Sequence, residues 1–200
     1  MVLGSVSVII LLLFPIAIIA LVVWATRRGG IAFDVRQTYF YLVALVTLLS
    51  AVFSAFLIAG GLFTVTFSNS PMPPNSYIWQ QTAGALGMLL VAMPVWWLHW
   101  RDARRRALAT KRLLALRIYL YAITVIALVT AVIVGGIAVS EIIKALFGLV
   151  DFSSVDGARM FWRDELTAVV NLLTALLVWF YHWRTVERVP ANEDSEGSHP

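Results

Sequence analysis

Two histidines are the residues of this chain whose type and spacing best suit chemistry. The pattern Trp-x-x-His-Trp-Arg occurs at residues 96–101 and again at residues 179–184, so that His99 and His182 stand 83 positions apart. A helical projection puts polar or small residues on the face of each histidine, and such faces turn toward protein rather than lipid. Both imidazoles are therefore expected to point into a helical bundle at the same depth.

Facing imidazoles of this kind can hold a b-type haem as its two axial ligands. In that interpretation His99 and His182 ligate the iron, and Arg101 and Arg184 contact the propionates. A structural interpretation competes with it, because tryptophan, tyrosine, histidine and arginine all suit the cytoplasmic boundary of a membrane. We favour the structural interpretation and expect no cofactor, since one histidine pair without a further cofactor motif indicates haem only weakly.

The structural interpretation assigns the aromatic residues of the pattern to helix packing at that boundary. There the histidines would hydrogen-bond tyrosines that open two other helices. The residues placed at this interface are Trp96, Trp100, Trp179, Trp183, Tyr39, Tyr41, Tyr119 and Tyr121, and Asn171 is expected to hydrogen-bond a neighbouring helix nearer the midplane.

A second group of polar residues lies near the opposite boundary: Glu141, Lys144, Arg163, Asp164 and Glu165. Charged side chains deep in a bilayer would mark an ion path. These lie close to water instead, so we expect a structural network at the outer surface, whose further role the sequence leaves open. Glu141 and Lys144 are three positions apart and can pair on one helix face.

The chain lacks the usual signatures of catalysis. It contains no cysteine, which excludes disulfides, thiolate metal sites and cysteine nucleophiles. It also shows no glycine-rich phosphate loop, no paired catalytic carboxylates, no Ser/His/Asp set and no metal-ligand spacing. We therefore expect neither enzymatic activity nor a metal site.

The composition predicts an all-α integral membrane protein. Hydrophobic residues make up 60% of the chain and charged residues 13%, and a soluble fold of 200 residues could not hide so much apolar surface. The pI of 9.8 does not indicate nucleic acid, because the basic residues stand at the ends of apolar runs. Seven of them lie in residues 101–117, which set the topology and can also bind anionic lipid.

Five apolar segments are long enough to span a bilayer. We place them at about residues 4–26, 38–67, 78–100, 117–147 and 163–186. Positive charge follows the first segment, whereas it precedes the apolar core of a signal peptide. Twelve lysines and arginines fall on one side of this arrangement and three on the other, which predicts an outside N-terminus and a cytoplasmic C-terminus.

The second and third segments resemble the fourth and fifth. The pair Tyr39 and Tyr41 recurs 80 positions later, and the His-Trp-Arg pattern recurs 83 positions later. The small residues Ala51 and Ala55 likewise match Ala131 and Gly135. Both copies begin and end on the inner side, so they are predicted to be parallel repeats about a pseudo-two-fold axis along the membrane normal. The predicted units are an N-terminal transmembrane helix at 1–28, hairpin repeats at 36–106 and 116–188, and a disordered cytoplasmic tail at 189–200.

This repeated Tyr-x-Tyr and His-Trp-Arg hairpin resembles a family of bacterial polytopic membrane domains of unknown function. The resemblance covers residues 36–188. It implies a multi-pass protein of the bacterial cytoplasmic (inner) membrane and brings no activity with it.

The function expected from these features is an accessory or interaction subunit of a larger membrane assembly. Its partners would be the lipid bilayer and either other membrane subunits or copies of itself. An electron carrier with haem between His99 and His182 is the alternative, and a small transporter or channel is a further one.

Overall fold

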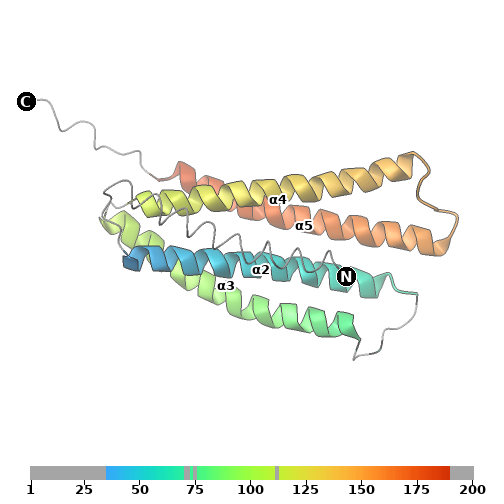
Figure 1. Cartoon of the computed structure of the whole chain (residues 1–200), viewed down its shortest axis with the longest axis horizontal. Coiled ribbons are helices and arrows are strands. Elements are labelled where there is room, and N and C mark those ends of the chain that lie inside the picture. The colour runs from blue at the N-terminus through green and yellow to red at the C-terminus, as the bar shows by residue number, and fades with distance from the viewer. Residues whose placement is uncertain (1–34, 70–72, 74–75, 111–112, 190–200) are drawn as a thin grey trace, which may run out of the picture.

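The computed structural model describes residues 35–69, 73, 76–110 and 113–189. All regular structure in these residues is helical: α2 (Val35–Thr66), α3 (Tyr77–Thr110), α4 (Leu114–Leu146) and α5 (Val155–Glu187) (Figure 1). The helix expected at about residues 4–26 and the tail expected at 189–200 lie outside the described residues, apart from residue 189.

The four described helices are long and apolar enough to cross a membrane. Their mean hydropathy in the most apolar window ranges from 1.4 to 2.7. At 1.5 Å per residue, helices of 32–34 residues exceed the roughly 30 Å hydrocarbon core of a bilayer. Their ends therefore reach into the headgroup layers on both sides.

Two helix boundaries differ from the sequence prediction. α3 continues to Thr110, so residues 101–110 are helical rather than a loop. α5 begins at Val155 instead of residue 163, because Ser154 caps it by accepting a hydrogen bond from the Gly157 N–H at 3.0 Å. Before this cap, Asp151 accepts hydrogen bonds from Ser153 and Ser154, which lower the pKa of its carboxyl group.

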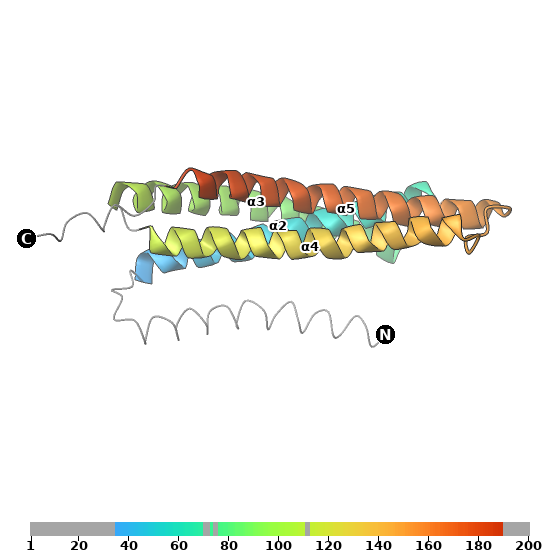
Figure 2. The same ribbon diagram turned by 90° about the horizontal axis from the view of Figure 1, so that it is seen from above.

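The helices form two hairpins, α2–α3 and α4–α5, which run in the same direction (Figures 1 and 2). The C-terminal ends of α2 and α4 and the N-terminal ends of α3 and α5 lie at one end of the molecule, which we call the turn end. The other end holds the last turns of α3, residues 101–110, which carry four arginines. We call it the basic end.

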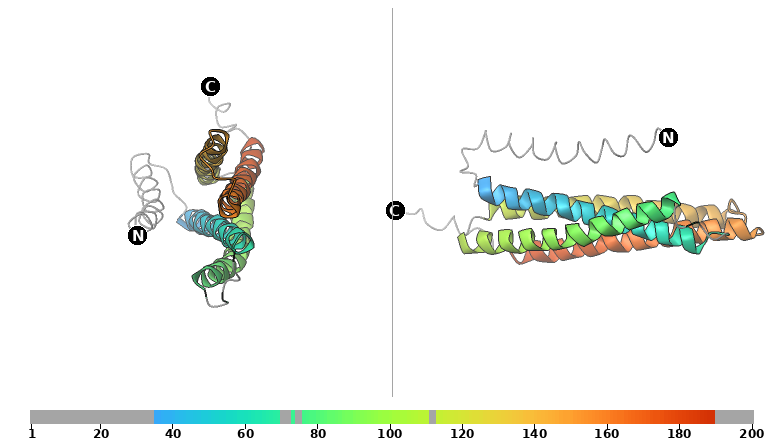
Figure 3. Two further views of the ribbon diagram at one scale, coloured as in Figure 1. Left: turned by 90° about the vertical axis from the view of Figure 1, so that its right-hand side faces the viewer. Right: turned by 90° about the horizontal axis from the view of Figure 1, so that it is seen from below.

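The hairpins meet chiefly along α2 and α5 (Figure 3). A pseudo-two-fold axis would make the contact between α3 and α4 equally extensive, because it exchanges α2 with α4 and α3 with α5. The α3–α4 contact is slight. The packing thus departs from the two-fold arrangement predicted from the sequence.

The size of the buried side chains differs between the two ends of the molecule. Large buried side chains, among them Trp100, Leu116, Leu120 and Ile123, gather toward the basic end. In the half nearer the turns the buried apolar residues among those described are alanines: Ala51, Ala59, Ala85, Ala92, Ala131, Ala138 and Ala168. Small residues let membrane helices approach closely, which replaces the hydrophobic effect as the source of packing energy in lipid.

Candidate functional site

Aromatic side chains from all four described helices meet at the basic end. The aromatic cluster consists of Tyr41 of α2, Trp96 and Trp100 of α3, Tyr119 of α4, and Tyr181 and His182 of α5. The rings of Trp100 and Tyr119 stack with centroids 5.0 Å apart, and those of Tyr119 and Tyr41 are 5.4 Å apart. Such pairs stabilise by about 0.5–1.5 kcal/mol beyond their buried area, so the cluster ties the two hairpins together.

The polar atoms of the cluster are hydrogen-bonded across helices. The indole of Trp96 donates to the Tyr119 hydroxyl at 3.3 Å, and that of Trp100 donates to the Tyr181 hydroxyl at 2.9 Å. The Tyr41 hydroxyl donates to the backbone carbonyl of Ala103 at 3.2 Å. These three bonds join α3 to α4, to α5 and to α2, so α3 is the element on which the cluster is built.

The two histidines lie in different surroundings. His182 is 1% exposed, and its ring contacts those of Trp96, Trp100 and Tyr119. His99 is only half-buried, and its ring lies against Phe40 and Tyr39 of α2. His182 therefore points into the bundle as expected, whereas the ring of His99 turns toward α2 and stays half-buried.

The histidines also do not hydrogen-bond the tyrosines as predicted. In each ring Nδ1 lies 2.8 Å from the carbonyl oxygen four residues earlier, at Val95 for His99 and Val178 for His182. A carbonyl only accepts, so Nδ1 carries the proton and Nε2 of the neutral ring is an acceptor. Nε2 of His182 is buried and has no hydrogen-bond partner among the described residues.

This packing does not fit the haem expected as the alternative. The ring contacts of His99 are with α2, whereas those of His182 are with α3 and α4, so the two imidazoles do not face each other across one plane. The ring of Trp100 lies beside that of His182, with centroids 5.9 Å apart. The arginines assigned to the propionates are exposed, and the guanidinium group of Arg184 lies 5.0 Å from the Phe180 ring.

A change of helical phase explains why the two copies differ. In α5, Ala168, Ala175 and His182 are seven positions apart and all buried, which is the period of helices in a left-handed coil. In α3, Ala85 and Ala92 follow the same period, but Trp100 is buried where the period predicts residue 99. Pro94 lies in this interval, and a proline inside a helix removes a backbone hydrogen bond and permits a local rotation.

Some of the other predicted interface residues are buried and others are exposed. Tyr41 and Tyr119 are buried, whereas Tyr39 and Tyr121 are 56% and 55% exposed, so sequence-equivalent tyrosines occupy opposite environments. On α5, Trp179 and Trp183 stack with each other on the outer surface rather than joining the cluster, and the indole of Trp183 donates to Glu187 at 2.9 Å.

At the turn end the predicted charged network forms only in part. Lys144 pairs with Glu141 at 2.6 Å, and Arg163 pairs with Asp164 at 2.8 Å. Glu165 joins neither pair: it is buried, and its Oε2 has no partner among the described residues. The reason is its position three residues before Ala168, on the buried face of α5.

Asn171 does not make the predicted interhelical hydrogen bond through its carbonyl oxygen. This Oδ1 atom is buried and has no partner among the described residues. It lies on α5 between the buried Ala168 and Ala175.

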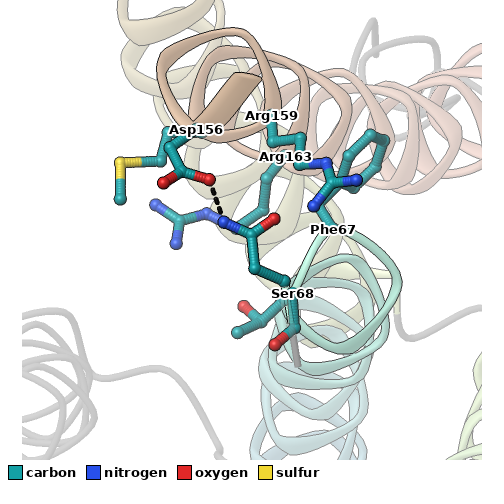
Figure 4. A pocket seen from close by; sticks show the side chains of 8 residues that line it. Phe67, Ser68, Asp156, Arg159 and Arg163 are labelled. Carbon is teal, nitrogen blue, oxygen red and sulfur yellow. Dashed lines mark hydrogen bonds between the residues drawn. The ribbon is translucent and has the colours of Figure 1, made fainter. Parts of the chain in front are cut away.

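A pocket at the turn end was not foreseen from the sequence (Figure 4). Its volume is about 210 Å³, and it lies between the end of α2 and the start of α5. Its walls include Phe67, Ser68, Asp156, Arg159, Met160 and Arg163. The i, i+4 spacing of Arg159 and Arg163 was the one sequence feature that could have indicated it.

Comparison with known protein families identifies a family for the chain. A family model described as a domain of unknown function, DUF5671, matches residues 37–161, which is more than half of the chain. The chain belongs to the DUF5671 family. No curated protein and no solved structure matches it. The match agrees with the expectation of a family of unknown function, but it ends early in α5 and does not include His182.

Proposed function

We propose that this DUF5671 protein is a non-enzymatic interaction subunit of a membrane assembly. In this proposal α3 packs against a transmembrane helix of another subunit, which a second copy of the chain would also provide. One observation carries the proposal: two glycines of α3 lie on its exposed surface, and a Cβ added at either would meet no atom of the described residues within 4 Å. They are Gly84 and Gly87.

Two other interior glycines of the helices, Gly61 and Gly135, show what a glycine can contribute in this fold. A Cβ at Gly61 would overlap the Thr82 hydroxyl, and one at Gly135 would lie 3.7 Å from Leu172, so both glycines allow close helix approach. At Gly84 and Gly87 an added Cβ would meet no atom within 4 Å. A glycine inside a helix costs about 0.5–1 kcal/mol relative to alanine, which makes an unused pair unexpected.

The spacing of the pair suits contact between helices. Gly84 and Gly87 are three positions apart and share one face, and Ala83 stands four positions before Gly87. Exposed Met88 and Val91 continue the same face. Association of helices in lipid relies on close approach of their backbones. A partner helix can therefore pack more closely against this glycine surface than lipid tails do.

Replacement of both glycines by leucine tests the proposal. The variant Gly84→Leu/Gly87→Leu should fold, because the surface is open, but should lose co-purifying subunits or its own oligomeric state in mild detergent. Gly136→Leu is the matched control, because a Cβ added at Gly136 of α4 would also meet no atom of the described residues within 4 Å. If the control dissociates the complex and the α3 variant does not, the assignment to α3 is wrong.

The absorption spectrum of the same preparation separates this proposal from electron transfer. The interaction subunit should show no Soret band. A Soret band that is lost in both His99→Phe and His182→Phe would replace the proposal with the haem interpretation.

A further inference from the structure

The pocket at the turn end has the position of a lipid headgroup site. It lies where the membrane-spanning part of α2 ends, beside the first turns of α5 (Figure 4). Helices of this length reach beyond the hydrocarbon core, so this depth corresponds to the headgroup layer. Its volume of about 210 Å³ is below the roughly 300–1,000 Å³ of sites for drug-sized ligands, which suits a headgroup.

One face of α5 supplies the charged side of the pocket. Asp156, Arg159 and Arg163 follow one another at spacings of three and four residues, so they project in the same direction. The opposite wall comes from the end of α2, where the amide of Asn69 donates a hydrogen bond to Oδ1 of Asp156. This bond joins the two hairpins across the pocket and leaves Oδ2 of Asp156 available.

The two arginines retain unused donors. Nε of Arg163 is occupied by Asp164 at 2.8 Å, but its two terminal nitrogens have no hydrogen-bond partner among the described residues. Arg159 is exposed and forms no ion pair or hydrogen bond with the described residues. Guanidinium groups bind phosphate through paired N–H donors, and two of them one helical turn apart can share one phosphate.

We propose that this pocket binds a zwitterionic phospholipid headgroup that carries a primary ammonium. Its phosphate contacts Arg159 and Arg163, its ammonium contacts Asp156, and the side chains of Phe67 and Met160 lie beside the glycerol region. The charges of the two arginines are balanced by those of Asp156 and Asp164. A ligand with separated charges and no net charge therefore complements the pocket better than a net anion does.

Lipid retention by the purified full-length protein tests the proposal. Native mass spectrometry would count the lipids that stay bound after incubation with phosphatidylethanolamine, phosphatidylcholine or phosphatidylglycerol. The wild type should retain phosphatidylethanolamine preferentially, because a trimethylated choline cannot donate hydrogen bonds to Asp156. Arg159→Gln/Arg163→Gln should weaken retention about tenfold, since hydrogen bonds between charged groups are lost. Asp156→Asn should abolish the preference over phosphatidylcholine while phosphate binding remains.

Two controls keep the test specific. Lys144→Gln removes a cation at the same end but outside the pocket, and should retain lipid as the wild type does. Arg163→Lys keeps the charge beside Asp164, and should preserve the fold while lowering retention. Wild-type retention in Arg159→Gln/Arg163→Gln, equal retention of ethanolamine and choline lipids, or a preference for phosphatidylglycerol would each overturn the proposal. Thermal stabilisation by inorganic phosphate without lipid retention would also overturn it, because it indicates a site for the free ion.

Discussion

Trp96 and Trp100 differ from Trp179 and Trp183 in what their indole groups bind. The first pair donates to tyrosines of α4 and α5 inside the bundle. The second pair stacks on the outer face of α5, and Trp183 bonds a glutamate of its own helix. The same sequence pattern thus packs between helices in α3 and lies on the outer surface in α5.

The Tyr-x-Tyr pair that opens α4 offers a matched test at this scale. Tyr119→Phe leaves the buried indole N–H of Trp96 without its acceptor, and we expect a loss of about 1–2 kcal/mol in the free energy of unfolding. Tyr121 is 55% exposed, so Tyr121→Phe should change it by less than about 0.5 kcal/mol. Reversible unfolding in detergent measures both. Equal effects would show that the Trp96–Tyr119 hydrogen bond contributes little.

His182 is expected to act through its ring rather than through its nitrogens. His182→Phe keeps an aromatic ring against Trp96 and Trp100. It removes one hydrogen bond, from Nδ1 to the Val178 carbonyl, and a buried Nε2 that has no described partner, so it should change stability by at most about 1 kcal/mol. His182→Ala opens a cavity and should cost about 3 kcal/mol. Replacement of the half-buried His99 by alanine should lower the free energy of unfolding by much less. The same unfolding assay compares them, and a large loss of stability in His182→Phe would show that the ring nitrogens contribute, through the Nδ1 hydrogen bond to Val178 or through Nε2.

At the scale of elements, the contact between α2 and α3 depends on one glycine. Gly61 lies against Thr82, whose hydroxyl is held by the Ile78 carbonyl at 2.8 Å. The neighbouring Gly60 has its nearest outside atom, Cγ2 of Thr167, at 3.9 Å. The close approach therefore lies within the first hairpin at Gly61, whereas Gly60 faces α5.

This difference predicts opposite effects of the same substitution at adjacent positions. Gly61→Ala forces α2 and α3 apart and should destabilise by about 1–2 kcal/mol. Gly60→Ala makes an ordinary contact and should be neutral or stabilise by about 0.5 kcal/mol, because alanine favours the helix. Thermal unfolding in detergent compares the two variants. If Gly61→Ala is as stable as Gly60→Ala, Thr82 must be free to move aside.

For the whole molecule, the direction in which the helices cross the membrane is set by charge. The basic end gathers helical arginines, and within it Arg106 pairs with Asp102 at 2.7 Å and lies 4.8 Å from the Phe40 ring. Twelve of the fifteen lysines and arginines of the chain fall on the side that we expect to be cytoplasmic. The turn end, with the proposed headgroup pocket, would then face outward.

Reporter fusions test this orientation in the complete chain. A reporter at Asn75, in the turn between α2 and α3, should lie outside, and one at Pro200 should lie in the cytoplasm. Fusions that read the same side at both positions would contradict the predicted topology and the number of spans.

The sequence by itself determined the helical, apolar class of the molecule and the approximate positions of the four described helices, but not the end of α3 or the start of α5. Apolar length and the separating turns are local properties, and the match to the DUF5671 family agrees with the prediction of an unknown-function membrane domain. The pairing of Glu141 with Lys144 also followed from spacing alone, since it involves one turn of one helix.

Only the tertiary structure decided which residues of the repeated pattern are buried. Burial depends on the rotational phase of a helix relative to its neighbours, and a shift of one residue turns a side chain by about 100°. Such a shift across Pro94 puts Trp100 on the buried face of α3, whereas the unbroken seven-residue period of α5 puts His182 on the buried face of that helix. The pocket between α2 and α5 arises in the same way, because it depends on how two hairpins distant in sequence come together.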